Sequence, residues 1–315
     1  MTTLSNHHPV VAAVDVGSNS VKMTVGRSNG SGGLDVLARG SETVRLGDNV
    51  ASTGVLADDR MAAARKTLRD FAETARQFGA VRLIGVATEA TRRASNGPAF
   101  LEQIREEIGW DLRVISGDEE AQLTFRGLAT EIELSGSVVV ADIGGGSTEV
   151  IIAGDGNVIH AESLRLGSGG LTERLVNSDP PTADELTACI GAATAKFTAI
   201  PLPPPRSSRL VTVGGTGEYL ARLVADPGNI GPNDLASALQ QCQSVTSHQL
   251  AVRIGAQQAR ARVLPAGLAI IQALANRIRP ERIEVAQSGI RIGLLLATLD
   301  ELSTETATHD EGGLQ

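Results

Sequence analysis

Aromatic side chains are scarce in this 315-residue sequence, which has five Phe, one Tyr and one Trp. Proteins that bind single-stranded nucleic acid generally stack its bases on aromatic rings, so the composition argues against that class of function. The net charge is −8, and a protein with this acidic balance does not bind DNA through its overall charge.

Cysteine and long apolar runs are also rare. The two cysteines, Cys189 and Cys242, have no CxxC spacing and no adjacent histidine, so we expect reduced thiols in the core of a cytoplasmic protein. No apolar run approaches the roughly 20 residues of a membrane helix. The first ten residues lack the charged-then-apolar order of a signal peptide. The sequence therefore indicates a globular protein, long enough for two domains.

Lysine is absent from one segment in which arginine is plentiful. Between Pro201 and Leu299 the chain has ten arginines and five acids, a charge of +5, so the remainder carries −13. A basic segment in an acidic protein suggests a polyanion as a local partner. We expect Arg253, Arg260 and Arg262 to bind along this polyanion. The alternative is a set of solvated surface arginines.

One short pattern occurs twice. Val11–Gly26 reads VAAVDVGSNSVKMTVG and Val138–Gly154 reads VVVADIGGGSTEVIIAG, and Asp142 lies 127 positions after its counterpart Asp15. In both copies, β-branched and apolar residues flank a turn rich in Gly and Ser, which predicts a strand, a tight turn and a second strand. A repeat at about the length of a small domain predicts two domains of similar core, each beginning with such a hairpin.

The two turns have the chemistry of a phosphate site. Bare glycine backbone can bring several N–H groups to one anion, and the hydroxyl groups of Ser20 and Ser147 can add donors. The carboxylates of Asp15 and Asp142 would repel phosphate directly, so they are better suited to a divalent cation. Mg²⁺ prefers a few carboxylates together with substrate oxygens, and Glu149 can join Asp142 on it. Two hairpins that only turn the chain are the alternative.

Strands and helices alternate along the rest of the chain, which predicts an α/β fold. Before the second copy we expect a helix over 58–79, a strand over 81–88, a helix over 98–109, a strand over 112–116 and a helix that begins at a Ser116–Glu119 capping box. After it we expect a strand over 157–167, a helix from Thr182, a strand, glycine turn and helix over 209–223, helices over 233–278, and a strand and helix over 282–302. The predicted domains are therefore residues 1–127 and 128–302, the second with a helical insertion, followed by a disordered tail over 303–315.

Further residues stand at positions suited to catalysis. Arg92 and Arg93 follow a buried strand, at the edge of the sheet where ligands of α/β folds bind, and an arginine there can neutralise charge on a phosphoryl group. The alternative is a surface arginine at the start of a helix. If Glu119 completes the capping box, Glu120 is free to act as a general base towards water. The alternative for Glu120 is an acid that complements the helix dipole.

Six motifs, in order, give these residues a family context. They are DVGSNSVKM, ATEATRRA, ISGDEEAQLTFRG, ADIGGGSTEV, VGGTGEYLA and SGIRIGLLL. Together they resemble the exopolyphosphatase and guanosine-pentaphosphate phosphohydrolase (Ppx/GppA) family in its short two-domain form, from about Val10 to about Leu302. The resemblance implies two actin-like (ribonuclease H-like) domains with mixed sheets flanked by helices and an active site in the cleft between the domains.

The resemblance also implies a role for each candidate residue. Glu120 would be the catalytic base, Arg92 the catalytic arginine, and Asp142 and Glu149 the ligands of Mg²⁺ or Mn²⁺. The residues that bind substrate phosphate would be Asp15, Gly17, Ser18, Asn19, Ser20, Gly144, Gly145, Gly146, Ser147, Gly214 and Gly215.

We therefore expect a Mg²⁺-dependent exopolyphosphatase that releases terminal phosphate from inorganic polyphosphate. We also expect a cytoplasmic homodimer that binds neither nucleic acid nor membrane. The first rival function is hydrolysis of guanosine pentaphosphate to the tetraphosphate, which needs the same residues. An ATP-dependent kinase would normally have an aspartate in place of Glu120. A non-catalytic regulator that binds polyphosphate or an alarmone would not need Glu120, Asp142 and Glu149 together.

Overall fold

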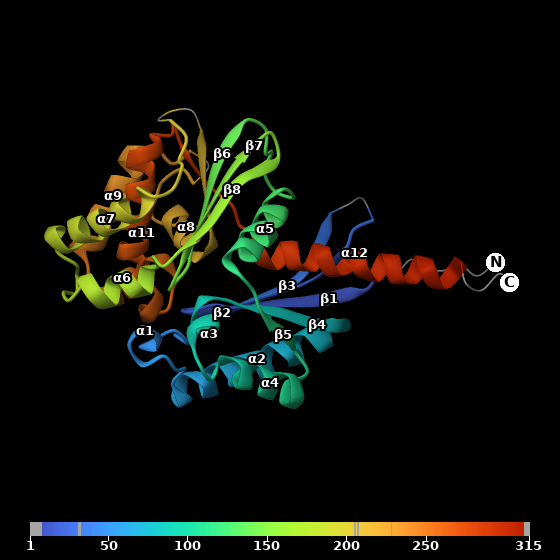
Figure 1. Cartoon of the computed structure of the whole chain (residues 1–315). Coiled ribbons are helices and arrows are strands. Elements are labelled where there is room, and N and C mark those ends of the chain that lie inside the picture. Colours follow the sequence, from blue (N-terminus) through green and yellow to red (C-terminus); the bar gives the residue numbers. More distant parts are fainter. Residues whose placement is uncertain (1–7, 31–32, 205, 207, 228, 312–315) are drawn as a thin grey trace.

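Two five-stranded mixed sheets, each flanked by helices, make up the computed structural model of the chain (Figure 1). The structure describes residues 8–30, 33–204, 206, 208–227 and 229–311, with side chains through Thr304. These sheets and helices confirm the predicted two-domain α/β fold.

The first sheet has the strand order β3-β2-β1-β4-β5. β1 pairs antiparallel with β2 and parallel with β4. Its strands are β1 (Val10–Val16), β2 (Ser20–Ser28), β3 (Leu34–Thr43), β4 (Ala80–Ala87) and β5 (Asp111–Val114). The accompanying helices are α1 (Val50–Thr53), α2 (Asp58–Gln77), α3 (Glu89–Arg93), α4 (Gly97–Ile108) and α5 (Gly117–Leu128).

The second sheet has the order β10-β9-β6-β7-β8, in which β6 to β10 take the places of β1 to β5 in the first. Its strands are β6 (Ser137–Ile143), β7 (Thr148–Gly154), β8 (Asn157–Leu164), β9 (Arg209–Val213) and β10 (Ile283–Val285). The helices are α6 (Ser168–Leu175), α7 (Ala183–Phe197), α8 (Gly214–Ala221), α9 (Pro232–Ser244), α10 (Ser247–Ile254), α11 (Gln258–Ile278) and α12 (Ile290–Glu311). The predicted duplication is therefore confirmed and extends over both whole sheets.

Apolar periodicity decides what each helix buries. One stripe of α2 is buried, and it includes Ala64, Leu68 and Phe71. In contrast, α11 is apolar on most sides and lies inside the core of the second half. Cys189 and Cys242 are buried in the same core, and both are free thiols, as predicted. Burial raises the pKa of both thiols, to about 11 and about 12, which keeps them protonated.

The last helix returns to the first half of the molecule. Figure 1 shows α12 beside α5 and β1, and its residues Ile292, Leu295 and Leu299 share a buried cluster with Val11 and Ala13. The division at residues 127 and 128 assigns α12 to the second domain, whereas its buried apolar contacts lie with the first.

The α5–α12 crossing is a contact of backbone with backbone. A Cβ atom on Gly293 would collide with the carbonyl oxygen of Leu123, and one on Gly127 with that of Gly289. Glycine at these positions lets the two helices approach more closely than any side chain would allow.

Several segments differ from the expectation. β3, α1, α3 and α6 were not among the predicted elements. The helix α12 continues to Glu311, whereas we expected disorder from Ser303; the part of that tail beyond Glu311 lies outside the described residues. Neither Gly nor Pro occurs between Ser303 and Glu311, so each added residue can extend the helix by one hydrogen bond. Within the described part of the chain, no helix has both the length and the apolar character needed to cross a membrane.

Candidate active site

The glycine turns of the two halves meet face to face. A Cβ atom on Gly145 would lie 2.7 Å from the Cβ of Asn19, and one on Gly146 would lie 2.7 Å from the Oγ of Ser18. Any side chain at Gly145 or Gly146 would therefore push the two halves apart. The turns also share one geometry, since Gly17 N donates to Ser20 O (3.1 Å) as Gly144 N donates to Ser147 O (3.0 Å).

The second turn is held from behind by α6. Ser168 N donates to Gly144 O and Gly169 N donates to Gly145 O, each at 2.9 Å. Because a trans peptide carries its N–H opposite its C=O, the N–H groups of Gly145 and Gly146 point away from α6. The first turn is held in the same way, with Gly47 N donating to Ser18 O at 2.7 Å.

Both turns line a small cavity of about 70 Å³, which contains most of the predicted site. All eleven predicted phosphate-binding residues line it, together with Glu120, Asp142 and Glu149. Backbone N–H groups that converge on such a space suit an anion. The structure therefore brings together every predicted site residue except Arg92, which stands behind Glu120.

Four carboxylates face this cavity: Asp15, Glu120, Asp142 and Glu149. Burial is the largest cause that raises the pKa of each of them, to about 6 for Asp15. The charge of Glu149 raises the pKa of Glu120 further. Among the described residues, Asp15 Oδ1 and Glu120 Oε2 are buried without a hydrogen-bond partner. Such a cluster is costly to ionise unless a cation joins it.

Asp142 and Glu149 are direct cross-strand neighbours in the β6–β7 hairpin. Opposed residues of an antiparallel pair project from the same face of the sheet, so their carboxylates can share one ion. No group of three or more His, Cys, Asp or Glu side chains in the described chain has the geometry of metal ligands. Mg²⁺ is commonly held by one or two carboxylates and completed by substrate phosphate, and this pair fits that pattern.

Glu120 reaches the cavity from the first turn of α5. Ser116 Oγ caps this helix by accepting from Glu119 N at 3.1 Å. The Glu119 carboxylate pairs with Arg113 Nη2 at 2.5 Å, so the predicted capping box is only half formed. The next residue, Glu120, is 7% exposed and takes no part in capping α5.

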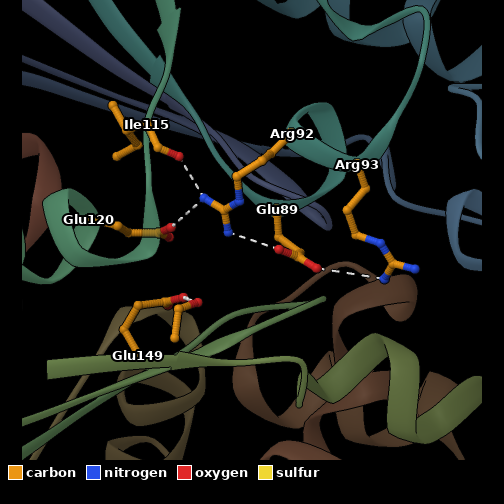
Figure 2. A network of polar contacts seen from close by, with 7 residues as sticks. Glu89, Arg92, Arg93, Ile115, Glu120 and Glu149 are labelled. Atoms are coloured by element: carbon orange, nitrogen blue, oxygen red, sulfur yellow. Dashed lines mark hydrogen bonds and ion pairs between the residues drawn. The ribbon is translucent and has the colours of Figure 1, made fainter.

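Arg92 stands beside Glu120 (Figure 2). Its Nη1 lies 3.7 Å from Glu120 Oε2 and donates to Ile115 O at 2.6 Å, while Nη2 donates to Glu89 Oε2 at 2.8 Å. The positive charge of Arg92 lowers the pKa of both Glu120 and Glu149. Arg92 is therefore a half-buried neighbour of Glu120 and not a solvated surface arginine.

The third glycine turn, at the start of α8, makes room for two charged groups. Gly214 has a φ of 75°, and a Cβ atom on it would lie 2.5 Å from Asp142 Oδ1. A Cβ atom on Gly215 would lie 2.5 Å from the Arg260 Nη2. Both glycines therefore let Asp142 and Arg260 approach the small cavity.

Two cations near the cavity, Lys22 and Arg291, were given no site role by sequence reasoning. Lys22 lines the cavity, and Arg291 interacts with Asp15 and Asp142 and donates from Nε to Thr24 Oγ1 at 3.0 Å. Lys22 occupies the position of Glu149 in the repeated motif, so alignment of the two copies could have identified it. Arg291 had no such local pattern, because its place depends on the return of α12 to the first half.

The expected arginine track is divided by the structure. Arg260 lines the small cavity. Arg262 donates to Ser178 O (2.7 Å) and to Val176 O (2.8 Å), so it ties two segments together. Arg253 is exposed and its Nη1 donates to Gln241 Oε1 at 3.3 Å.

Two larger cavities adjoin the small one on different sides. One, of about 680 Å³, shares Asp15, Lys22, Asp142 and Gly214 with it and also reaches Arg39 and Arg291. The other, of about 350 Å³, shares Ser18, Asn19, Gly145 and Gly146 and also reaches Glu89 and Arg93. Neither larger cavity is lined by Glu120.

Relatives of known sequence are similar to this chain over nearly its whole length. Exopolyphosphatase 2 of Mycobacterium tuberculosis is 30% identical over 312 residues, which cover 91% of this chain and 98% of the relative. A guanosine-5'-triphosphate,3'-diphosphate pyrophosphatase of Pseudoalteromonas atlantica is 28% identical over 314 residues, 96% of this chain and 61% of the relative.

Solved structures share the fold. The Ppx/GppA family member of Aquifex aeolicus has a TM-score of 0.76 at 27% identity, over 93% of this chain and 98% of its own. An exopolyphosphatase-like protein has a TM-score of 0.82 at 26% identity, over 93% and 99% of the two chains. The family model described as Ppx/GppA phosphatase matches residues 24–302. The chain therefore belongs to the Ppx/GppA phosphatase family and has its actin-like fold.

Proposed function

We propose that this protein is an exopolyphosphatase, which releases terminal phosphate from inorganic polyphosphate by attack of water. The observation that carries the proposal is the position of Glu120: it lines the same small cavity as the two glycine turns, of which Gly145 and Gly146 have N–H groups that point away from α6. The relatives that carry the name exopolyphosphatase support the same substrate.

In this mechanism the terminal phosphate lies in the small cavity that both glycine turns line. The N–H groups of Gly145 and Gly146 hold its oxygens, because fixed dipoles stabilise charge without reorganisation. Glu120, in its ionised form, orients a water molecule and accepts its proton. Arg92 favours that ionised form, since it lies 3.7 Å from the Glu120 carboxylate.

A divalent cation at Asp142 and Glu149, which we propose to be Mg²⁺ or Mn²⁺, would neutralise phosphate charge when bound. Side chains of the protein balance the remaining charge at the site. Asp15 and Lys22 are direct neighbours in the β1–β2 hairpin, so the lysine balances the aspartate on the opposite wall.

The rest of the substrate extends into the cavity of about 680 Å³. Displacement at phosphorus proceeds with attacking and leaving oxygens roughly in line, so the leaving chain must lie away from Glu120. This cavity meets the site at Asp15, Lys22 and Asp142, and Glu120 does not line it. Arg291 would bind the phosphate groups that follow the bond to be cleaved.

Guanosine pentaphosphate is the second candidate substrate. The volume of about 680 Å³ beside the small cavity favours it, since that space exceeds what a linear phosphate chain requires. The proteins named guanosine-5'-triphosphate,3'-diphosphate pyrophosphatase are similar to this chain over 96% of its length.

A single panel of substrates tests the proposal. Phosphate release is measured from polyphosphates of several lengths, guanosine pentaphosphate and ATP, each with Mg²⁺, with Mn²⁺ and with excess EDTA. We expect kcat/KM to be highest for polyphosphate and activity to be lost in EDTA. A higher kcat/KM for guanosine pentaphosphate would reverse the order of the two candidates, and full activity in EDTA would exclude the metal role.

We also propose a cytoplasmic homodimer. The two reduced, buried cysteines fit a reducing compartment. The mass measured by light scattering during gel filtration tests the dimer, because a monomer would have the chain mass of 32.7 kDa.

A further inference from the structure

A second buried carboxylate stands behind the site. Glu89, the first residue of α3, is 7% exposed, and it belongs to the ATEATRRA motif. Its position makes Arg92 and Arg93 its neighbours on one helix face, at the i+3 and i+4 positions. In Figure 2 the Glu89 carboxylate lies between the two guanidinium groups.

Glu89 fixes Arg92 more strongly than Glu120 does. The Glu89 Oε2 accepts from Arg92 Nη2 at 2.8 Å, which is a charge-assisted hydrogen bond, whereas Glu120 Oε2 lies 3.7 Å from Nη1. The second anchor of Arg92 is Ile115 O, which immediately precedes the start of α5. The guanidinium is thus tied to Glu89 on one side and to the α5 start on the other, and Glu120 stands beside it.

Glu89 also lies close to the second half of the molecule. A Cβ atom on Gly146 would lie 3.4 Å from the Cγ of Glu89, and Glu89 lines the cavity of about 350 Å³ together with Gly145 and Gly146. Its Oε1 has no hydrogen-bond partner among the described residues and lies 3.6 Å from Arg93 Nη1. The Glu89 side chain therefore binds the Arg92 guanidinium and also lies near the glycine turn that would hold the phosphate.

A buried ion pair contributes little to stability on average, because removing two charges from water offsets their attraction. The geometry suggests a different use. We infer that Glu89 is a positioning residue, which holds the Arg92 guanidinium beside Glu120. The effect of Glu89 on catalysis then passes through Arg92. The inference rests on the proposed function for its assay and for the role of Arg92.

A double-mutant cycle tests this path. Glu89→Ala removes the anchor, and we expect kcat for polyphosphate to fall about 10- to 100-fold with KM within about threefold, since a misplaced catalytic group costs that much. Glu89→Gln keeps an oxygen that accepts from Arg92, so about a fivefold loss of kcat is expected. In an Arg92→Ala background, Glu89→Ala should change the residual kcat by less than about twofold. Losses that multiply in the double variant would overturn the inference.

The matched control is Glu102→Gln. Glu102 forms an i,i+3 pair with Arg105 at 3.0 Å, the same spacing as Glu89 and Arg92, on the exposed face of α4. This variant should keep kcat within about 1.5-fold. If Glu89→Ala does not fold, Glu89→Gln and its combination with Arg92→Ala decide the question.

A crystal structure of Glu89→Ala or Glu89→Gln gives a readout that is independent of activity. We expect the Arg92 guanidinium of the alanine variant to leave its place between Glu120 and Ile115, and that of the glutamine variant to remain. An unchanged Arg92 in the alanine structure would refute the positioning role. If the wild type cleaves guanosine pentaphosphate and not polyphosphate, the proposed function fails alone, and the same cycle is measured on the pentaphosphate.

Discussion

The two halves of the molecule have one sheet topology and two different chemistries. In the first hairpin Asp15 stands opposite Lys22, and in the second Asp142 stands opposite Glu149. The first pair balances its own charge, whereas the second is doubly negative. The proposed cation site therefore lies in the second half, although the sheet around it has the same topology as the first.

The elements that follow the hairpins differ in the same way. After β4 the chain places Arg92 on α3, and at the equivalent point after β9 it places Gly214 at the start of α8. The helix after the last strand carries Glu120 in the first half, on α5, and Arg291 in the second, on α12. Both halves thus supply walls of the same topology, and they differ at a few positions that line the cavity: the proposed base lies on the first half and the proposed cation site on the second.

The largest expected effect comes from removal of the base that only the first half has. Glu120→Gln keeps the size of the side chain and removes its basicity, so kcat should fall by about 10²-fold or more. Substrate binding should persist, because the glycine turns, Arg92 and the carboxylates of the second half remain, and the loss should appear in kcat with KM little changed. Steady-state kinetics of phosphate release measure both. A near-normal kcat would end the general-base mechanism and favour a binding protein or a kinase.

Arg291 has no counterpart cation in the first half, and its removal should have the next largest effect. Arg291→Gln should raise the KM for long polyphosphate by about tenfold, since a hydrogen bond to a charged group contributes about 1.5–3 kcal/mol. The same change at exposed Arg253 is the control and should leave KM within about twofold. Initial rates over a range of salt concentrations give the comparison. Equal shifts in KM for the two variants would show that the phosphate chain does not bind in the cavity of about 680 Å³.

The raised pKa values of the buried carboxylates also predict how cation binding depends on pH. Burial raises the pKa of Asp15 to about 6 and the pKa values of Asp142 and Glu149 above their usual range. In the cation-free protein these groups contribute stability below their unfolded pKa of about 4, and that stability is lost as the pH rises through the folded values. A divalent cation binds the ionised forms and should restore it.

Calorimetry with MgCl₂ or MnCl₂ and with EDTA measures this effect. We expect the cation to raise Tm by several degrees at pH 8 and by less at pH 5. In Asp142→Asn, which lacks one of the proposed ligands, the difference between pH 8 and pH 5 should shrink. The same increase in Tm at both pH values would argue against binding at buried carboxylates.

The smallest effect is expected at the acid next to the base. Glu119 pairs with Arg113 at the surface, and such pairs contribute about 0–1 kcal/mol. Glu119→Gln should therefore change the free energy of unfolding by less than about 1 kcal/mol and leave kcat near normal. Urea unfolding and kinetics check the two parts. A large loss of kcat in Glu119→Gln, together with a normal kcat in Glu120→Gln, would mean that Glu119 and not Glu120 is the general base.

Local pattern was sufficient to predict the hairpins and to single out Glu120, which lines the small cavity. The repeated Asp-x-Gly turns predicted both halves, because a glycine turn between β-branched runs is decided by neighbours in sequence. Residues whose place depends on distant chain segments were different. Arg291 becomes part of the site only because α12 crosses back to the first sheet. Arg253 and Arg260 have the same charge and segment, yet one is exposed on α10 and the other is buried beside Gly215.

The backbone contact between α5 and α12 determines how far a distant change is felt. Leu123 lies three residues after Glu120 on α5, and Gly293 lies two residues after Arg291 on α12, so the crossing is within a helical turn of one charged group from each half. No side chain separates the two backbones there that could adjust its rotamer and absorb added volume. A single methyl group at Gly293 would be transmitted as a rigid displacement of both groups. The relative positions of Glu120 and Arg291 therefore depend on a backbone contact that side chains cannot adjust.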